Sequence, residues 1–171
     1  MPNIQGRFIS MSEVKIFVPL GTQRFPFSRL IVALNSLVEK GLYSKDEIVM
    51  QSSVYPVKPI FKHVSLIPYD EFNKFIDDAE VVVTHSGVNS IISCMEREKP
   101  LVICPRLSKY KEHVDDHQNE IADLMRDKYD VLVCRDMHDL ASFIDLAKTH
   151  KYKSWVSHRS ELMNAIKDLV V

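Results

Sequence analysis

The amino-acid sequence predicts an α/β fold built on a doubly wound, Rossmann-like parallel sheet. Short apolar runs recur along the chain, and most are continuously apolar, as strands covered on both faces should be. Segments with apolar residues at helical spacing separate these runs. This alternation of strands and helices is typical of a parallel sheet that carries helices on both faces.

The expected strands are the apolar runs themselves. In chain order they read VKIFVPL, EIVMQ, HVSLIPY, EVVVTH, PLVICP and DVLVCR, at 14–20, 47–51, 63–69, 80–85, 100–105 and 130–135. In the Rossmann order the first and fourth strands are neighbours, and ligands bind beyond their carboxyl ends, where the strand order reverses. The tips of these two strands, Gly21-Thr22 and His85-Ser86-Gly87, would then border one crevice.

The expected helices lie between the runs. The first presents one apolar face from Phe27 to Val38, and Gly41 follows it as a C-terminal cap. A short helix carries Phe72, Phe75 and Ile76 and ends at Asp77-Asp78 before the fourth strand. Three further helices are indicated by the apolar positions of Val88–Met95, Ile121–Met125 and Leu140–Ala147, and Asp115 or Asp116 is the expected N-cap of the second of these. A last helix is expected at 152–170, with an apolar stripe that runs from Trp155 to Val170.

The composition restricts the class of protein. A chain of 171 residues with 46% hydrophobic residues fits one domain with a real core. Lysine and arginine total 22 against 23 aspartates and glutamates, so the basic excess of a nucleic-acid surface is absent and no nucleic-acid partner is expected. The three cysteines, Cys94, Cys104 and Cys134, make no CxxC pair and are expected to be buried, reduced thiols of a cytoplasmic protein.

The expected domain covers residues 13–171. Residues 1–12 lack clear periodicity and the layout of a signal peptide, so we expect a loose N-terminal extension there. No apolar stretch approaches the ~20 residues of a membrane span.

The segment THSGVNSIISCMEREKPLVICPR, at 84–106, contains the candidate residues for binding an anion. A helix that begins directly after the fourth strand would direct free N–H groups and its positive dipole end at the crevice. Gly87 would let a ligand approach the backbone, and Ser86, Asn89 and Ser90 would add polar donors. This pattern predicts a seat for a diphosphate. The alternative is that Gly87 only makes a tight turn and Ser86 only caps the helix. The GxGxxG, GxxxxGK[ST] and GxSxG motifs are absent.

The tip of the fifth strand adds the polar segment PRLSKYKEHVDDHQNE. Arg106, Lys109 and Lys111 bring positive charge to the same edge, and His113 and His117 lie four residues apart. HVDDH differs from HExxH and no third ligand is evident, so no metal is expected. Hydrogen bonding to an anionic ligand is favoured, and a solvated loop followed by a capped helix is the alternative.

From about Val14 to Asp136 the chain resembles the nucleotide-sugar-binding, C-terminal half of family 28 glycosyltransferases, which have GT-B architecture. The resemblance is carried by VPLGTQRFPFSRL, DDAEVVVTHSGVNSI, KPLVICPR and KEHVDDHQNEIADL, in that order. Relatives of this type include the peptidoglycan enzyme MurG and the catalytic subunit of the dolichol-pathway UDP-GlcNAc transferase. RFPF and the EHVDDHQ segment are most similar to PssE-type exopolysaccharide and capsule proteins.

The resemblance implies a binding site for a UDP-sugar. Family members hold the donor's phosphates, base and sugar with positions that correspond here to Gly21, Thr22, His85, Ser86, Gly87, Asn89, Ser90, Pro105, Arg106, His117 and Gln118, and Lys109 and His113 lie in the same loop. Relatives also place a glutamate where this chain has Ser93, to grip the ribose hydroxyls. Serine cannot chelate two hydroxyls as a carboxylate does, so Glu112 is the expected substitute.

The resemblance also implies a partner subunit. A full GT-B enzyme has a second domain that binds the acceptor and supplies the general base, so no catalytic residue is assigned to this chain. We expect an inverting hexosyltransferase subunit that needs no cofactor or metal. It would act with a membrane-anchored, acceptor-binding subunit at the inner face of the membrane, on a lipid-linked saccharide in exopolysaccharide or capsule synthesis.

Two other functions are weighed against this one. A non-catalytic nucleotide-sugar-binding or activating subunit is the first, and Ser93 favours it. A free-standing nucleotide-sugar enzyme is the second, and the chain length disfavours it. The last helix is the expected docking surface for the partner, and packing on its own core is the alternative.

Overall fold

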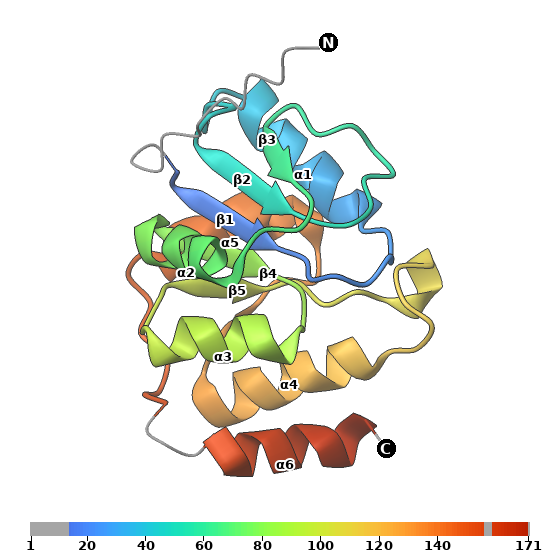
Figure 1. The fold of residues 1–171 in the computed structure, drawn as a ribbon, viewed down its shortest axis with the longest axis vertical. Helices are drawn as coiled ribbons and strands as arrows, with labels where there is room; N and C mark the ends of the chain where they lie inside the picture. The colour runs from blue at the N-terminus through green and yellow to red at the C-terminus, as the bar shows by residue number, and fades with distance from the viewer. Residues whose placement is uncertain (1–13, 156–158, 171) are drawn as a thin grey trace.

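A six-stranded parallel sheet forms the centre of the computed structural model, which describes residues 14–155 and 159–170 (Figure 1). The strands are β1(Ile16–Pro19), β2(Ile48–Gln51), β3(Lys62–Val64), β4(Val81–Thr84), β5(Leu101–Ile103) and β6(Leu132–Val133). Their order is β3-β2-β1-β4-β5-β6, and every neighbouring pair is parallel. This is the Rossmann order, so the predicted fold class is confirmed and β1 and β4 are neighbours.

The strands are shorter than the apolar runs that predict them. The third run is the clearest case, because β3 ends at Val64 and α2(Tyr69–Asp78) begins within the run. Pro68 lies at the N-terminus of α2, where its missing N–H costs nothing. The intervening Leu66 and Ile67 therefore leave the sheet and lie at its carboxyl edge.

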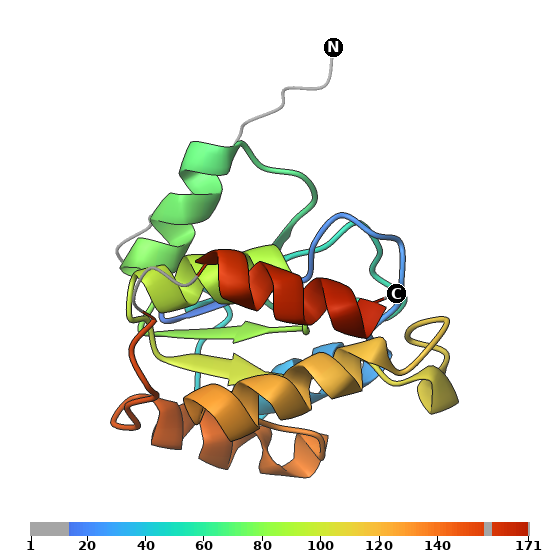
Figure 2. The ribbon, with the colours of Figure 1, turned by 90° about the horizontal axis from the view of Figure 1, so that it is seen from below.

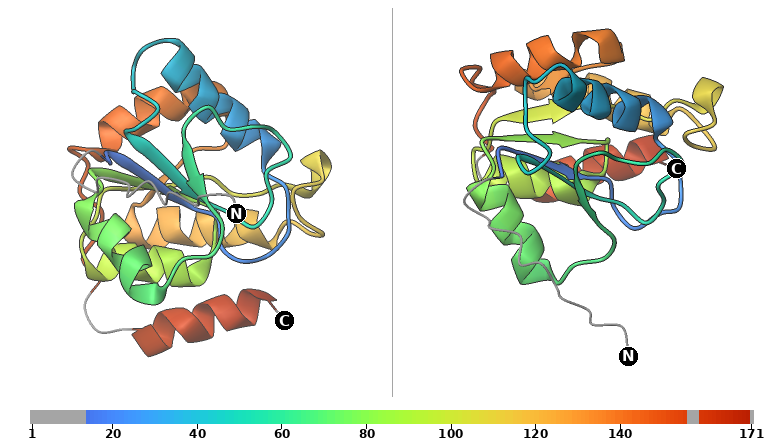
Figure 3. Two further views of the ribbon diagram at one scale, coloured as in Figure 1. Left: turned by 45° about the horizontal axis from the view of Figure 1, so that its top comes forward. Right: turned by 90° about the horizontal axis from the view of Figure 1, so that it is seen from above.

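The helices cover the sheet on both faces. α1(Ser28–Glu39) and α5(Leu140–Ala147) pack on one face, where Leu30, Leu34 and Ile144 join one buried apolar cluster (Figure 3). α2, α3(Val88–Glu96), α4(His117–Tyr129) and α6(Arg159–Val170) contribute to the cluster on the other face. Two short 3₁₀ helices, η2(Ser108–Tyr110) and η3(Met137–Asp139), precede α4 and α5.

The last helix begins at Arg159 and is shorter than the predicted 152–170. It lies beside α4 (Figure 2), and Leu162 and Ile166 are buried in the core of the same face. Trp155 lies before the helix, with its ring 5.7 Å from that of Tyr129. Much of the apolar stripe therefore packs on its own domain. Residues 156–158 and the expected extension at 1–12 lie outside the described residues.

Several smaller expectations are met. All three cysteines are free and buried, and burial raises the pKa of the Cys94 thiol to about 12. α2 ends at Asp78, as predicted. Asp116, one of the two predicted positions, is the N-cap residue of α4, but its side chain makes no capping hydrogen bond. Oδ1 of Asp115 instead accepts a hydrogen bond from the His117 N–H at 3.1 Å. No helix in the described ranges is both long and apolar enough to cross a membrane.

Gly41 ends α1 in the predicted way. Its φ is +72°, its N–H donates to the Val38 carbonyl at 3.0 Å, and the Leu42 N–H donates to the Leu37 carbonyl at 3.0 Å. These two bonds define a Schellman motif, in which a left-handed residue closes the helix.

Replacing Gly41 by alanine should lower the free energy of unfolding by about 1 kcal/mol, because a Cβ disfavours the left-handed conformation. A Cβ at this position meets no atom within 4 Å, so no steric clash adds to that cost. Urea denaturation of the two proteins measures the difference. An unchanged midpoint would contradict the role given to Gly41.

Candidate functional site

A cleft of about 550 Å³ opens beyond the carboxyl ends of β1 and β2, beside α3, the helix that follows β4, near the reversal of the strand order. Its volume lies within the range typical of sites for small ligands. The lining residues come from the tips of β1 and β2, from the β3–α2 connection, from the first turn of α2 and from α3: Gly21, Thr22, Gln51, Leu66, Ile67, Tyr69, Phe72, Asn89, Ser90, Ile92, Ser93 and Glu96. Of the predicted site residues, the cleft brings together Gly21, Thr22, Asn89 and Ser90.

The two sides of the cleft differ in chemistry. One side is apolar, and its Leu66 and Tyr69 are 69% and 72% exposed. The other side is the polar face of α3, where Asn89, Ser93 and Glu96 follow each other at helical spacing. α3 begins at this edge of the sheet, so its first-turn N–H groups, which have no intrahelical acceptor, lie beside the cleft.

Gly87 is required because the His85 ring folds back over it. A Cβ at Gly87 would lie 2.4 Å from Nε2 of His85, which is closer than real Cβ contacts. The φ of Gly87 is −74°, so backbone strain does not demand glycine here. The His85 ring therefore occupies the space that a Cβ would need, and the access of a ligand to the Gly87 backbone stays a prediction. Gly21 approaches the same ring, with its Cβ position 3.2 Å from Nε2.

Gln118, at the start of α4, makes hydrogen bonds to residues at the tips of both β4 and β5. Its Oε1 accepts from the Ser86 N–H at 3.4 Å and from the Arg106 N–H at 3.0 Å, and its Nε2 lies 3.1 Å from Nδ1 of His85. Its backbone carbonyl accepts from the Ser86 hydroxyl at 2.6 Å. Ser86 therefore does not cap α3, and the amide of Gln118 points inward, not to a bound sugar as the resemblance implied.

Arg106 is fully buried and holds the loop after β1. Its guanidinium lies 3.1 Å from Nδ1 of His85 and donates to the carbonyls of Leu20 and Phe25 at 3.4 and 3.3 Å. Burial lowers the pKa of Arg106 to about 10, which leaves it charged at neutral pH. Arg106 was expected to border the ligand, and the structure places its whole side chain away from the surface.

Glu112 also lies outside the cleft. Its carboxylate accepts from Nε of Arg29 at 2.7 Å, from Nη2 of Arg29 at 2.9 Å and from the Leu107 N–H at 3.0 Å. Only 2% of Glu112 is exposed. Arg29 further donates to the carbonyls of Pro105 and Arg135. This carboxylate is buried and fully paired, which argues against the expectation that Glu112 binds ribose.

The other predicted residues of the β5–α4 connection lie away from the cleft. Lys109 is exposed beside the Tyr110 ring, and His113 packs at 4.5 Å on the Phe25 ring. His117 is 40% exposed at its side chain and lies 3.2 Å from Glu120. Within the ranges 14–155 and 159–170, no group of three or more His, Cys, Asp or Glu residues could hold a metal ion.

Leu66, Ile67 and Glu96 are among the cleft residues that the sequence did not assign to the site. Leu66 and Ile67 belong to an apolar run that predicts a strand, and their exposure shows only once β3 ends early. Glu96 lies one turn beyond Ser93 on the same face of α3. That i, i+3 spacing is a sequence signal that could have identified Glu96 as the carboxylate of the site.

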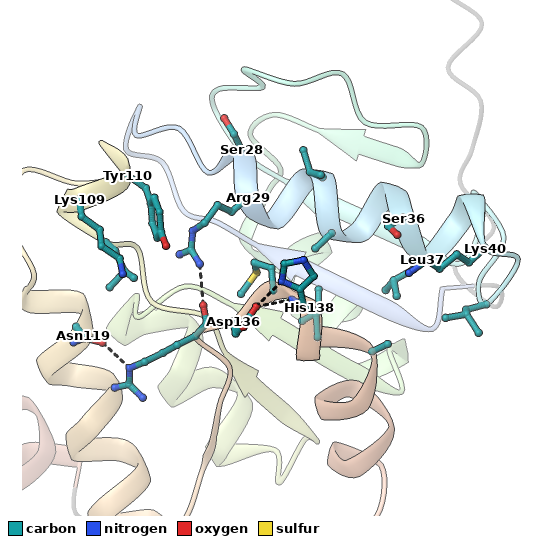
Figure 4. A pocket seen from close by; sticks show the side chains of 18 of the residues that line it. Ser28, Arg29, Ser36, Leu37, Lys40, Lys109, Tyr110, Asn119, Asp136 and His138 are labelled. Carbon is teal, nitrogen blue, oxygen red and sulfur yellow. Dashed lines mark hydrogen bonds and ion pairs between the residues drawn. The ribbon is translucent and has the colours of Figure 1, made fainter.

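A second, larger cavity of about 1160 Å³ lies between α1 and the η3–α5 segment (Figure 4). Of the predicted site residues it contains only Lys109. Many of its polar groups are already paired with one another. Arg29 donates to the Arg135 carbonyl, Arg135 donates to Asn119, and His138 contacts Asp136. We therefore assign the site to the smaller cleft, where the strand order reverses.

Known proteins share this fold. The NMR structure of ALG13 covers 90% of this chain and 95% of its own, with a TM-score of 0.56 and 19% identity. A kitacinnamycin glycosyltransferase gives a TM-score of 0.54, and the spinosyn forosaminyltransferase SpnP gives 0.51. Both are 14% identical, and the matches cover 94% and 91% of this chain and 40% of each enzyme. At these identities the likeness concerns the fold.

Sequence comparison identifies the family. The UDP-N-acetylglucosamine transferase subunit ALG13 of Candida albicans is 25% identical over 92 residues, which are 54% of this chain and only 30% of that protein. The profile of the glycosyltransferase family 28 C-terminal domain matches residues 15–169, almost the whole chain. The chain therefore belongs to the glycosyltransferase family 28 C-terminal domain family.

Proposed function

We propose that the 550 Å³ cleft binds the UDP part of a nucleotide sugar and that the chain is the donor-binding subunit of an inverting glycosyltransferase. The observation that carries this proposal is the position of the cleft. It lies at the tip of β1, near the reversal of the strand order, and joins the polar face of α3 to the apolar side that contains Leu66 and Ile67.

The diphosphate would lie against the start of α3. The free N–H groups of the first turn and the positive end of the helix dipole favour an anion there. Thr22 and Asn89 are exposed at the same place and add polar groups from two different elements. The donor needs no metal in this proposal, because fixed backbone dipoles would stabilise the charge of the leaving UDP.

The nucleoside would occupy the remainder of the cleft. Leu66 and Ile67 offer an apolar surface for the flat base, and Glu96 lies across from them on α3. A carboxylate can accept hydrogen bonds from both ribose hydroxyls, which a serine at position 93 cannot do. Glu96 thereby takes the role that sequence reasoning gave to Glu112.

The acceptor and the general base would come from a separate subunit. ALG13 is itself named as a subunit of a UDP-N-acetylglucosamine transferase, which supports an assembly of this kind. A hydroxyl of a lipid-linked saccharide would attack the anomeric carbon in line and invert it. We assign this step to the inner membrane face, with a membrane-anchored partner, in exopolysaccharide or capsule synthesis. The support is the PssE-type resemblance of RFPF and EHVDDHQ.

Calorimetric titration of the purified chain tests the nucleotide site. UDP should bind saturably, and ADP and GDP should bind far more weakly. Glu96→Gln should weaken UDP binding about tenfold or more, because hydrogen bonds to a charged acceptor are lost. Glu39→Gln is the matched control, since Glu39 is an exposed glutamate at the end of α1, outside the cleft.

The titration also separates the enzyme from the alternative, a non-catalytic subunit, which Ser93 favours. Absence of UDP binding both by the lone chain and by its complex with the partner would support the non-catalytic subunit. Equal binding by Glu96→Gln and the unaltered chain would refute the assigned nucleoside position. Rapid sugar transfer by the lone chain would refute the need for a partner.

A further inference from the structure

The orientation of the Gln118 amide is fixed by two backbone donors. The N–H groups of Ser86 and Arg106 can only donate, and both point at the same amide atom, at 3.4 and 3.0 Å. That atom must therefore be the oxygen of Gln118. The NH₂ group then faces Nδ1 of His85 at 3.1 Å and donates to it.

Nδ1 of His85 receives a second donor from Arg106. Nη1 of the guanidinium lies 3.1 Å away, and a guanidinium has no acceptor. A ring nitrogen that faces two donors must carry its lone pair there. The ring proton of a neutral histidine then lies on the other nitrogen, Nε2.

Nε2 of His85 lies between the two glycines of the strand tips. The Cβ positions of Gly87 and Gly21 are 2.4 and 3.2 Å from it. Gly21 lines the cleft, whereas His85 and Gly87 do not, so this nitrogen lies next to a residue of the proposed diphosphate seat. In the part of the chain that the structure describes, no acceptor pairs with Nε2.

We propose that Gln118 and Arg106 are positioning residues that hold His85 in the neutral Nε2–H tautomer, so that His85 presents a fixed donor to an anionic oxygen bound beside Gly21 and Gly87. This inference rests on the proposed nucleotide site for the identity of the anion. Its first half, the tautomer, stands on the geometry of the free chain alone.

The charges around the ring agree with a neutral histidine. Burial, then the Arg106 charge, lower the pKa of His85 to about 3, and His113 acts in the same direction while Gln118 opposes it. Glu112 lies near Arg106 but is paired with Arg29. Because the folded pKa lies below the ordinary value of 6.5, the neutral ring adds stability that is complete above pH 6.5 and is lost as the pH falls toward 3.

The test is heteronuclear NMR of isotope-labelled protein, in which the two ring nitrogens of a neutral histidine have distinct shifts. His85 should show a protonated Nε2 and a bare Nδ1 from about pH 5 to pH 8. Gln118→Glu keeps the side-chain shape but turns one of the two donors that face Nδ1 into a carboxylate acceptor, so a proton on Nδ1 should become favourable. Asn119→Asp makes the same chemical change at the next residue, which contacts Arg135, and should leave His85 unaltered.

UDP titrations of the same variants provide the second readout. Gln118→Glu should weaken UDP binding about tenfold or more at neutral pH, because a lone pair replaces the N–H that faces the anion. Asn119→Asp should bind UDP as the unaltered chain does. A purely structural role for Gln118 predicts neither the change of tautomer nor the loss.

Each failure identifies a different error. A protonated Nδ1 in the unaltered chain would overturn the tautomer assignment, and this spectrum does not depend on any variant folding. An inverted tautomer in Gln118→Glu with unchanged UDP affinity would overturn the donor role of His85. Failure of the unaltered chain to bind UDP would overturn the nucleotide site, while the NMR spectra would still decide the tautomer.

Discussion

Replacing Gly87 by alanine is expected to abolish UDP binding while most of the fold persists. The added Cβ would lie 2.4 Å from Nε2 and 2.5 Å from Cε1 of His85, and the ring would have to leave its place. The ring cannot turn aside freely, because Arg106 and Gln118 hold its other edge. The backbone at the start of α3 must therefore shift as well, and the N–H groups proposed to face the diphosphate shift with it.

Calorimetry and urea denaturation together measure this effect. We expect the UDP affinity of Gly87→Ala to fall about a hundredfold or more, and the free energy of unfolding to fall by about 1–3 kcal/mol, the usual cost of overpacking. Gly41→Ala is the matched control, because it should lower stability alone. Retention of UDP affinity within about twofold by Gly87→Ala would show that the His85–Gly87 contact has no part in the site.

The sheet was predictable because its signals are local. Continuous apolar runs such as VVVT and LVIC indicate strands buried on both faces, and β4 and β5 are buried throughout. The glycine that ends α1 was equally local, since a left-handed cap is encoded by one residue. Strand lengths were less predictable, because the early end of β3 depends on Pro68 and the start of α2.

The sequence predicted that polar residues gather near the carboxyl edge of the sheet, but it did not predict which of them are buried. Arg106 pairs with the carbonyl of Leu20, and Glu112 pairs with Arg29, across 86 and 83 residues of sequence. Both contacts arise only when the parallel sheet brings the tips of distant strands to one edge. A sequence pattern can place a charged residue at that edge. Whether its side chain binds a ligand or pairs with another part of the protein depends on its burial, which the pattern does not give.

Glu96 shows the converse. Its position on the cleft side of α3 follows from helical spacing alone. Its carboxylate lines the cleft, where our proposal places the ribose, whereas the carboxylate of Glu112 is buried. The pattern of the resembling family drew attention to position 93 and to the nearest downstream acidic segment. Our proposal assigns the ribose instead to Glu96, one turn along the same helix from Ser93.

Glu112→Gln should lower the free energy of unfolding by about 3 kcal/mol, because it leaves the partly buried charge of Arg29 without its partner. The side chains of Arg29 and Glu112 are only 19% and 3% exposed, so water compensates little. The affinity for UDP should stay within about twofold of the unaltered chain, since Glu112 does not line the cleft. Urea denaturation and calorimetry measure the two quantities on the same preparations.

A double-mutant cycle with Arg29→Met separates the ion pair from other effects of the substitution. The double variant should be more stable than the sum of the two single losses predicts, by about 1–3 kcal/mol, because the second substitution removes the unpaired charge. Asp127→Asn is the control, since Asp127 and Arg126 form a pair that is 67% and 48% exposed and should change stability by less than about 0.5 kcal/mol. A Glu112→Gln variant that kept full stability but lost UDP would restore Glu112 as a ligand of the nucleotide. The opposite outcome, lost stability with intact binding, would mean that this carboxylate fixes the loop carrying Arg106 to the start of α1 and that ribose recognition lies elsewhere.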